Sequence, residues 1–163
     1  MVKAIFLDRD GVINYDHGYI YKVSDFKFVK GVFEALKKFQ ELGFLLFVVT
    51  NQSGIGRGYY LESDFLKLND FMLKEFSKNN INISKVYYCP HSPKEGCECR
   101  KPKNKLLLEC RESFKIDFSK SYFIGDKQSD IDCANSVSMK SFLVKKDCDD
   151  ELEKVFEEII NVE

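Results

Sequence analysis

Two aspartates, two residues apart, follow an apolar run near the N-terminus. In "AIFLDRDGVIN", Asp8 and Asp10 come directly after residues 4–7, which are predicted to form a short buried strand. This spacing turns both side chains the same way in an extended chain, and Gly11 permits a sharp turn after them. Carboxylates this close repel each other unless one is protonated or a cation lies between them. The pair therefore predicts a site for a hard divalent cation such as Mg²⁺, with an ordinary surface turn as the alternative.

Other polar residues follow other predicted strands. Thr50 and Asn51 come after the apolar run 44–49, and Asp126 and Lys127 come after "SYFIG". The carboxyl ends of parallel strands meet at one edge of a sheet, so these groups should lie together, with Asp126 as a third oxygen ligand. A carboxylate beside Mg²⁺ can attack phosphorus, and a second one can act as general acid and base. Thr50 and a nearby lysine would then hold the phosphoryl oxygens.

The elements that must position these residues alternate along the chain. Helical patterns cover residues 31–42, 62–79, 105–114, 129–137 and 149–160. Further strands are expected at 84–88 and 141–144, and loops at 14–28, 51–58 and 89–104. This alternation predicts an α/β fold, a three-layer Rossmann-like sandwich with a mostly parallel sheet, formed by one domain over residues 1–163.

The loop at 89–104 contains a second set of possible metal ligands. In "CPHSPKEGCEC", the side chains of Cys89, His91, Cys97 and Cys99 would offer three thiolates and an imidazole, a complete tetrahedral set for a structural zinc ion. Unrelated loop thiols with a surface histidine are the alternative, because this spacing differs from the common Cys-x2-Cys pattern. Arg100 and Lys101 follow at once, so a metal would fix the direction of two cations suited to phosphate, which could otherwise be a solvated basic pair.

Four motifs in this order carry a resemblance to a known family. "FLDRDG", "VVTNQSG", "RKP" and "FIGDK" resemble motifs of the haloacid dehalogenase-like phosphatases, and the likeness covers most of the chain. It implies that Asp8 is the nucleophile, Asp10 the acid/base, and Thr50 and Lys101 the residues that steady the phosphoryl group. It also implies that Mg²⁺ is held by the Asp8 side chain, the Asp10 backbone carbonyl and Asp126.

The loop 89–104 with its possible zinc ligands narrows the resemblance to two groups within this family. Only about 40 residues separate Asp10 from Thr50, which leaves no room for a large cap domain and predicts an open site. A capless chain with "DHGY", "CPH" and "CECRKP" is similar to heptose 1,7-bisphosphate phosphatases and to their sister group, the histidinol-phosphate phosphatases. The first group implies hydrolysis of the 7-phosphate through an aspartyl-phosphate, and a product for nucleotide-sugar and lipopolysaccharide synthesis. Histidinol phosphate or another small phosphate monoester is the alternative substrate.

The resemblance also implies a set of substrate-binding residues. They are Asp16, His17, Gly18, Tyr19, Asn51, Gln52, Ser53, Arg100 and Lys127. His17 could equally be a loop histidine satisfied by backbone, and Tyr19 a packed aromatic. Asp130 could lie near Mg²⁺, but the first turn of the following helix is the favoured interpretation. Cys110 and Cys133 lie on apolar helix faces and are expected in the core.

The bulk composition excludes several classes of function. The chain has 163 residues, 44% hydrophobic and 31% charged, with a net charge of −1. This balance offers no electrostatic footprint for nucleic acid or an anionic membrane, and no apolar run is long enough for a membrane span. The beginning "MVKAIFLD" lacks a signal-peptide pattern, so a cytoplasmic protein with reduced cysteines is expected, with a monomer as the default. A zinc-loop binding module without catalysis is the competing hypothesis from another class.

Overall fold

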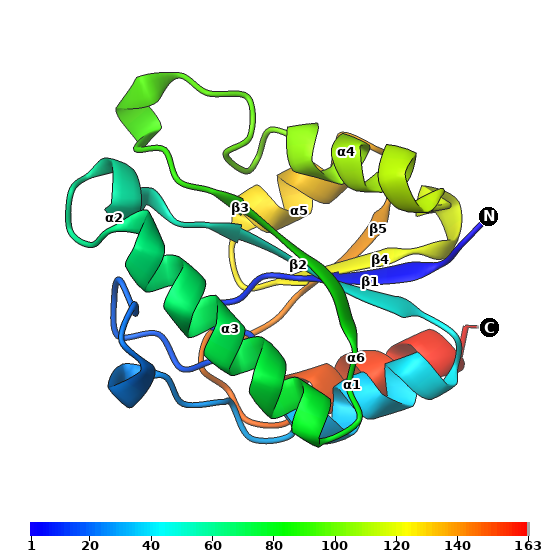
Figure 1. Cartoon of the computed structure of the whole chain (residues 1–163). Helices are drawn as coiled ribbons and strands as arrows, with labels where there is room; N and C mark the ends of the chain where they lie inside the picture. Colours follow the sequence, from blue (N-terminus) through cyan, green and yellow to red (C-terminus); the bar gives the residue numbers. More distant parts are fainter. Residues whose placement is uncertain (163) are drawn as a thin grey trace.

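The computed structural model describes residues 1–162, so Glu163, the last residue of the predicted domain, lies outside the described residues. Within residues 1–162 there are five strands and six α-helices, and each strand is followed by one or two helices (Figure 1). The strands are β1 (Ala4–Leu7), β2 (Leu45–Asn51), β3 (Ile83–Cys89), β4 (Tyr122–Gly125) and β5 (Lys140–Leu143). The helices are α1 (Val32–Glu41), α2 (Ser53–Gly56), α3 (Glu62–Lys78), α4 (Lys105–Phe114), α5 (Gln128–Asn135) and α6 (Glu151–Ile160). Short 3-10 turns are found at Val23–Asp25, Pro93–Glu95 and Phe118–Lys120.

The strands form one parallel sheet in the order β3-β2-β1-β4-β5. Strand β1 therefore lies in the middle, with Phe6 opposite both Phe47 of β2 and Phe123 of β4. Chain order reverses on the two sides of β1, which makes its carboxyl end a switch point where α/β sheets bind ligands. The predicted parallel α/β fold is confirmed.

Helices cover both faces of this sheet and bury two separate apolar cores (Figure 1). Alternate residues of β1 divide between them, because side chains of a strand point to opposite faces: Ile5 belongs to one core and Phe6 to the other. The first core includes residues of α1, α3 and α6, and the second includes residues of α4 and α5. Cys110 and Cys133 are buried in the second core, as predicted from their helix faces.

The main helices are amphipathic and pack by one stripe. In α1 the buried residues Val32, Ala35, Leu36 and Phe39 repeat at helical spacing, while the opposite side is exposed. Among the described residues, none of the helices has the length and apolar character that crossing a membrane requires.

The glycine-rich segment 51–58 differs from the predicted loop. Strand β2 continues to Asn51, which pairs with Cys89 of β3, and the Gln52 N–H donates to the Cys89 carbonyl at 2.8 Å. The single-turn helix α2 follows, with the Arg57 N–H donating to the Ser53 carbonyl at 2.9 Å. The glycines here permit a tight turn rather than prevent regular structure, and this turn stands directly beside the candidate site.

Candidate active site

Asp8 lies at the carboxyl end of the central strand. Its N–H donates to the Ile124 carbonyl at 3.1 Å, which extends the β1–β4 ladder by one residue and fixes the direction of the side chain. The Asp8 carboxylate is almost fully buried, and its Oδ1 accepts from the Arg9 N–H at 2.8 Å. A buried carboxylate of this kind needs a positive partner.

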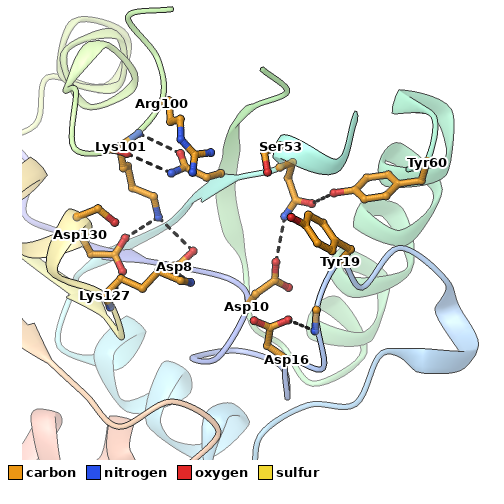
Figure 2. A pocket seen from close by; sticks show the side chains of 14 residues that line it. Asp8, Asp10, Asp16, Tyr19, Ser53, Tyr60, Arg100, Lys101, Lys127 and Asp130 are labelled. Carbon is orange, nitrogen blue, oxygen red and sulfur yellow. Dashed lines mark hydrogen bonds and ion pairs between the residues drawn. The ribbon is translucent and has the colours of Figure 1, made fainter. Parts of the chain in front are cut away.

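Lys101 supplies that partner. Its Nζ lies 3.1 Å from Asp8 Oδ1 and 2.7 Å from Asp130 Oδ1, and it donates to the Val49 carbonyl at 2.7 Å (Figure 2). Burial acts to raise the pKa of Asp8, but the ammonium groups of Lys101 and Lys127 outweigh burial and hold the pKa below its usual value. Burial would likewise lower the pKa of Lys101, yet Asp8 and Asp130 raise it. The geometry therefore keeps Asp8 ionised and Lys101 charged.

The end of β2 brings Lys101 to this position. The Asn51 side chain bonds the Lys101 backbone in both directions: its Nδ2 donates to the carbonyl at 3.2 Å, and its Oδ1 accepts from the N–H at 3.0 Å. Lys101 lies in the loop 89–104, which would otherwise leave this lysine far from the end of β2. Asn51 thus positions Lys101, in addition to lining the pocket itself.

Asp8, Asp126 and Asp130 form an acidic cluster. One carboxylate oxygen from each lies within 4.8 Å of the others, and Gly11 makes this possible, because a Cβ there would approach Asp126 Oδ2 to 2.4 Å. Burial, and then the charge of Asp8, raise the pKa of Asp126 to about 7. Its buried Oδ1 accepts no hydrogen bond and lies 3.5 Å from Lys127 Nζ. Carboxylate oxygens that lie this close together, one of them without a hydrogen-bond donor, fit a site for a hard divalent cation.

Asp10 has a different environment, although it is only two residues away. Its Oδ1 accepts from Arg9 Nε at 2.9 Å, from Arg9 Nη2 at 2.7 Å and from Asn14 Nδ2 at 3.1 Å. Arg9 is itself buried and also donates to the Ile20 carbonyl at 2.8 Å. This explains the guanidinium in "DRDG": it is a buried support for Asp10, rather than a group that faces the pocket.

A pocket of about 280 Å³ opens over these groups (Figure 2). The predicted site residues that line it are Asp8, Asp10, Asp16, Gly18, Tyr19, Asn51, Gln52, Ser53, Arg100, Lys101 and Lys127. Three other predicted residues do not line it. Thr50 is buried and accepts from Gln52 Nε2 at 2.9 Å, Asp126 belongs to the acidic cluster, and His17 is exposed.

Three residues that line the pocket were not predicted from the sequence. Tyr60, Ser129 and Asp130 line the pocket but were absent from the predicted site. Asp130 does lie in the first turn of α5, where its Oδ2 accepts from the Lys127 N–H at 3.2 Å, and it also contacts Lys101. Its place in the first turn was expected because the helix dipole favours an acidic side chain there, whereas the contact with Lys101 depends on the fold.

The four predicted thiol and imidazole ligands form a second cluster. Cys99 Sγ lies 2.9 Å from Cys89 Sγ and 3.2 Å from His91 Nδ1, and Cys97 Sγ lies 3.5 Å from Cys89 Sγ. Burial acts to raise the pKa of Cys97, but the Arg100 backbone N–H and the neighbouring thiols lower it to about 7. All four ligand atoms lie within 4.8 Å of one another, which fits a tetrahedral metal site.

Comparison with known proteins shows the family to which this chain is related. Residues 98–158 match the HAD-hydrolase-like family model. Over 129 residues, which are 79% of this chain and 74% of the relative, the chain is 58% identical to a D-glycero-alpha-D-manno-heptose-1,7-bisphosphate 7-phosphatase of Campylobacter jejuni. It is 42% identical over 146 residues to the D-glycero-beta-D-manno-heptose-1,7-bisphosphate 7-phosphatase of Haemophilus influenzae, covering 86% of this chain and 79% of that relative.

A solved structure has the same fold. The D,D-heptose 1,7-bisphosphate phosphatase of B. bronchiseptica, in complex with magnesium and phosphate, matches 99% of this chain and 100% of its own. The TM-score is 0.86 at 22% sequence identity. With the ordered motifs, the acidic cluster and the two closer relatives, the chain belongs to the heptose-1,7-bisphosphate 7-phosphatase family of haloacid dehalogenase-like hydrolases.

Proposed function

We propose that this chain is a Mg²⁺-dependent phosphatase that removes the 7-phosphate of D-glycero-D-manno-heptose 1,7-bisphosphate. The family is one of phosphoric monoester hydrolases. The observation that carries the proposal is the buried, ionised Asp8 at the pocket floor, 3.1 Å from the Lys101 ammonium and inside the acidic cluster.

Two metal sites complete the proposal. Mg²⁺ would be held by the Asp8 side chain, the Asp10 backbone carbonyl and Asp126, where it would neutralise phosphoryl charge. A zinc ion would be held by Cys89, His91, Cys97 and Cys99, with no ligand position left for substrate, so its role is structural.

In the first chemical step a carboxylate oxygen of Asp8 attacks phosphorus. The bond from phosphorus to the sugar oxygen breaks, and Asp10 gives its proton to the leaving oxygen. The charge that develops on the phosphoryl oxygens faces Lys101 and the Thr50 hydroxyl. In the second step Asp10 accepts a proton from water, which attacks phosphorus and releases inorganic phosphate with free Asp8.

The rest of the pocket would bind the sugar and the second phosphate. Arg100 lines the pocket, and its buried Nη1 has no hydrogen-bond partner, so it offers a donor to an anionic group. Lys127 is half exposed beside Asp8. We assign the remaining substrate contacts to the lining residues Asp16, Gly18, Tyr19, Asn51, Gln52 and Ser53, and to His17, which is exposed outside the pocket lining.

The test is a substrate panel with excess Mg²⁺. The α and β anomers of heptose 1,7-bisphosphate, fructose 1,6-bisphosphate and histidinol phosphate are compared by kcat/KM for phosphate release, and phosphorus NMR identifies the phosphate removed. We expect a heptose bisphosphate to be preferred, with the 1-phosphate retained. Preference for histidinol phosphate would reassign the substrate, and no release from any ester would favour a binding module.

We also propose that the enzyme works as a cytoplasmic monomer. Every group named in the mechanism comes from one chain, so a second copy is not needed to complete the site. Size-exclusion chromatography with an activity assay on each fraction tests this: activity should elute at the mass of one chain, 19.0 kDa.

A further inference from the structure

Gln52 lies between two groups of different chemical role. Its side-chain Nε2 donates to Thr50 Oγ1 at 2.9 Å and to Asp10 Oδ2 at 3.3 Å. The residue is only 2% exposed, so its amide acts mainly on these two side chains, and any substrate contact is made by the small edge that lines the pocket. Its two donors point at the acid/base and at the hydroxyl that faces the phosphoryl group.

Tyr60 determines which way this amide points. Its hydroxyl donates to Gln52 Oε1 at 2.6 Å. Burial raises the pKa of Tyr60 to about 12, so the hydroxyl keeps its proton and remains a donor. With Oε1 bound in this way, the Nε2 end of Gln52 must face Asp10 and Thr50.

The ring of Tyr60 is itself held in place. It stacks on the Tyr21 ring with centroids 5.0 Å apart and an interplanar angle of 10°. On the α2 side it packs against Gly54, where a Cβ would come within 2.1 Å of the ring carbon Cε1. The glycine at position 54 therefore leaves room for the ring in the position from which its hydroxyl reaches Gln52.

The two oxygens of Asp10 are unequal as a result. Oδ1 accepts hydrogen bonds from three donor groups, two on Arg9 and one on Asn14. These donors surround Oδ1, so a proton on this oxygen would have no acceptor to face. From the part of the chain that the structure describes, Oδ2 receives only the longer bond from Gln52, and Asp10 lines the pocket. The oxygen that can carry a proton towards substrate is thus Oδ2.

We propose that Gln52, held by Tyr60, is a positioning residue that aims Asp10 Oδ2 at the reacting oxygen. This rests on the proposed phosphatase chemistry but not on the identity of the sugar. Tyr60 acts only through Gln52.

The proposal separates the two halves of the reaction when the leaving group is p-nitrophenolate. Asp8 attacks phosphorus and the aryl oxygen leaves with the bonding electrons as a stable anion, so this half needs little help from Asp10. Hydrolysis of the aspartyl-phosphate still needs Oδ2 to take a proton from water. A poorly aimed Asp10 should therefore slow the second half alone.

The experiment is stopped-flow measurement of p-nitrophenol release with excess Mg²⁺. For Tyr60→Phe we expect the burst-phase rate to stay within about threefold of wild type, while steady-state turnover falls about tenfold. Gly54→Ala pushes the ring away by a different route and should give the same split. Tyr88→Phe is the matched control, because it removes a hydroxyl whose partner is the exposed Glu62.

Two results would overturn the proposal. One is a Tyr60→Phe enzyme whose burst and steady-state rates both stay within about twofold of wild type. The other is a loss of burst amplitude and turnover in the same proportion, which a merely structural role would give. Because p-nitrophenyl phosphate replaces the sugar ester, an error in the proposed sugar substrate would leave this result standing.

Discussion

The acidic cluster and the thiol cluster are both sets of metal ligands, but different forces assemble them. Asp8 and Asp126 follow adjacent strands, β1 and β4, whose backbone hydrogen bonds fix their separation. All four thiol-cluster ligands come from one segment, residues 89–99, in which residues 93–96 are exposed to solvent. The fold therefore preorganises the acidic cluster, whereas the thiol cluster would need its ion to hold a fixed shape.

Lys101 joins the two regions. It follows Cys99 by two residues, yet its ammonium lies between Asp8 and Asp130. Part of the catalytic charge thus comes from the thiol-cluster segment, and the Asn51 side chain and the Val49 carbonyl of β2 hold Lys101 against the sheet. A preorganised acidic site can therefore depend on a cation from a loop that has no apolar core of its own.

The largest effect is expected from the acidic cluster itself. Asp8→Asn removes the nucleophile, and phosphate release should fall by at least about a thousandfold. The circular dichroism spectrum and melting temperature of this variant should remain close to those of wild type. The control is Asp132→Asn, on the exposed side of α5, which should keep the wild-type spectrum, melting temperature and activity. Activity above a few per cent of wild type would contradict covalent catalysis.

The next effect tests the joint between the regions. Lys101→Met leaves Asp8 and Asp130 without their cation, which should cost about 3 kcal/mol of folding free energy and about a hundredfold in kcat. Mg²⁺ should restore more stability to this variant than to wild type, measured by thermal melting with and without the ion. Lys105→Met, which removes an exposed partner of Glu109, should change neither quantity; equal losses in both variants would sink the assignment.

A smaller effect is expected from the thiol cluster. Removing zinc with a chelator, followed by excess Mg²⁺, should speed hydrogen exchange over residues 89–104 and lower kcat about tenfold, because Arg100 and Lys101 lose their anchor. Strands β1 and β4 should exchange as before. Cys97→Ser should reproduce the change and Cys148→Ser should not; no zinc in freshly purified protein would contradict the assignment.

The smallest effect concerns a bond that holds the same loop without a metal. Lys103 Nζ donates to the Cys97 carbonyl at 2.8 Å and pairs with the exposed Glu98 at 3.1 Å. If the ion is the main anchor, Lys103→Ala should change kcat by less than about twofold, since exposed pairs contribute little. A loss as large as that of Cys97→Ser would show that protein contacts hold the loop instead.

Much of this comparison could be predicted from the sequence. Buried runs that end in Asp8, Thr50 and Asp126 indicated parallel strands whose tips meet, because periodicity and strand-end chemistry are local signals. The ligands Cys89 to Cys99 are close in sequence, so their grouping was also visible. The helix bounds at 105–114 agree with α4 as observed.

The rest depends on contacts that no local pattern encodes. Tyr60 reaches Gln52 only because helix α2 forms in a segment predicted as a loop, and because Gly54 leaves room for its ring. Asp130 was correctly placed at a helix start, but its contact with Lys101 joins residues from separate elements. Such side-chain networks follow from tertiary packing, which residue types alone do not specify.

The central place of β1 has a consequence for how the molecule opens. Its backbone is bonded to a strand on each side, so exposing its amides to solvent requires two neighbours to separate, whereas α6 can detach from one face. Thermal fluctuations that free the terminal helix or the edge strands therefore leave the nucleophile-bearing tip in register. Asp8 is attached to the segment that should be the last to lose its protection.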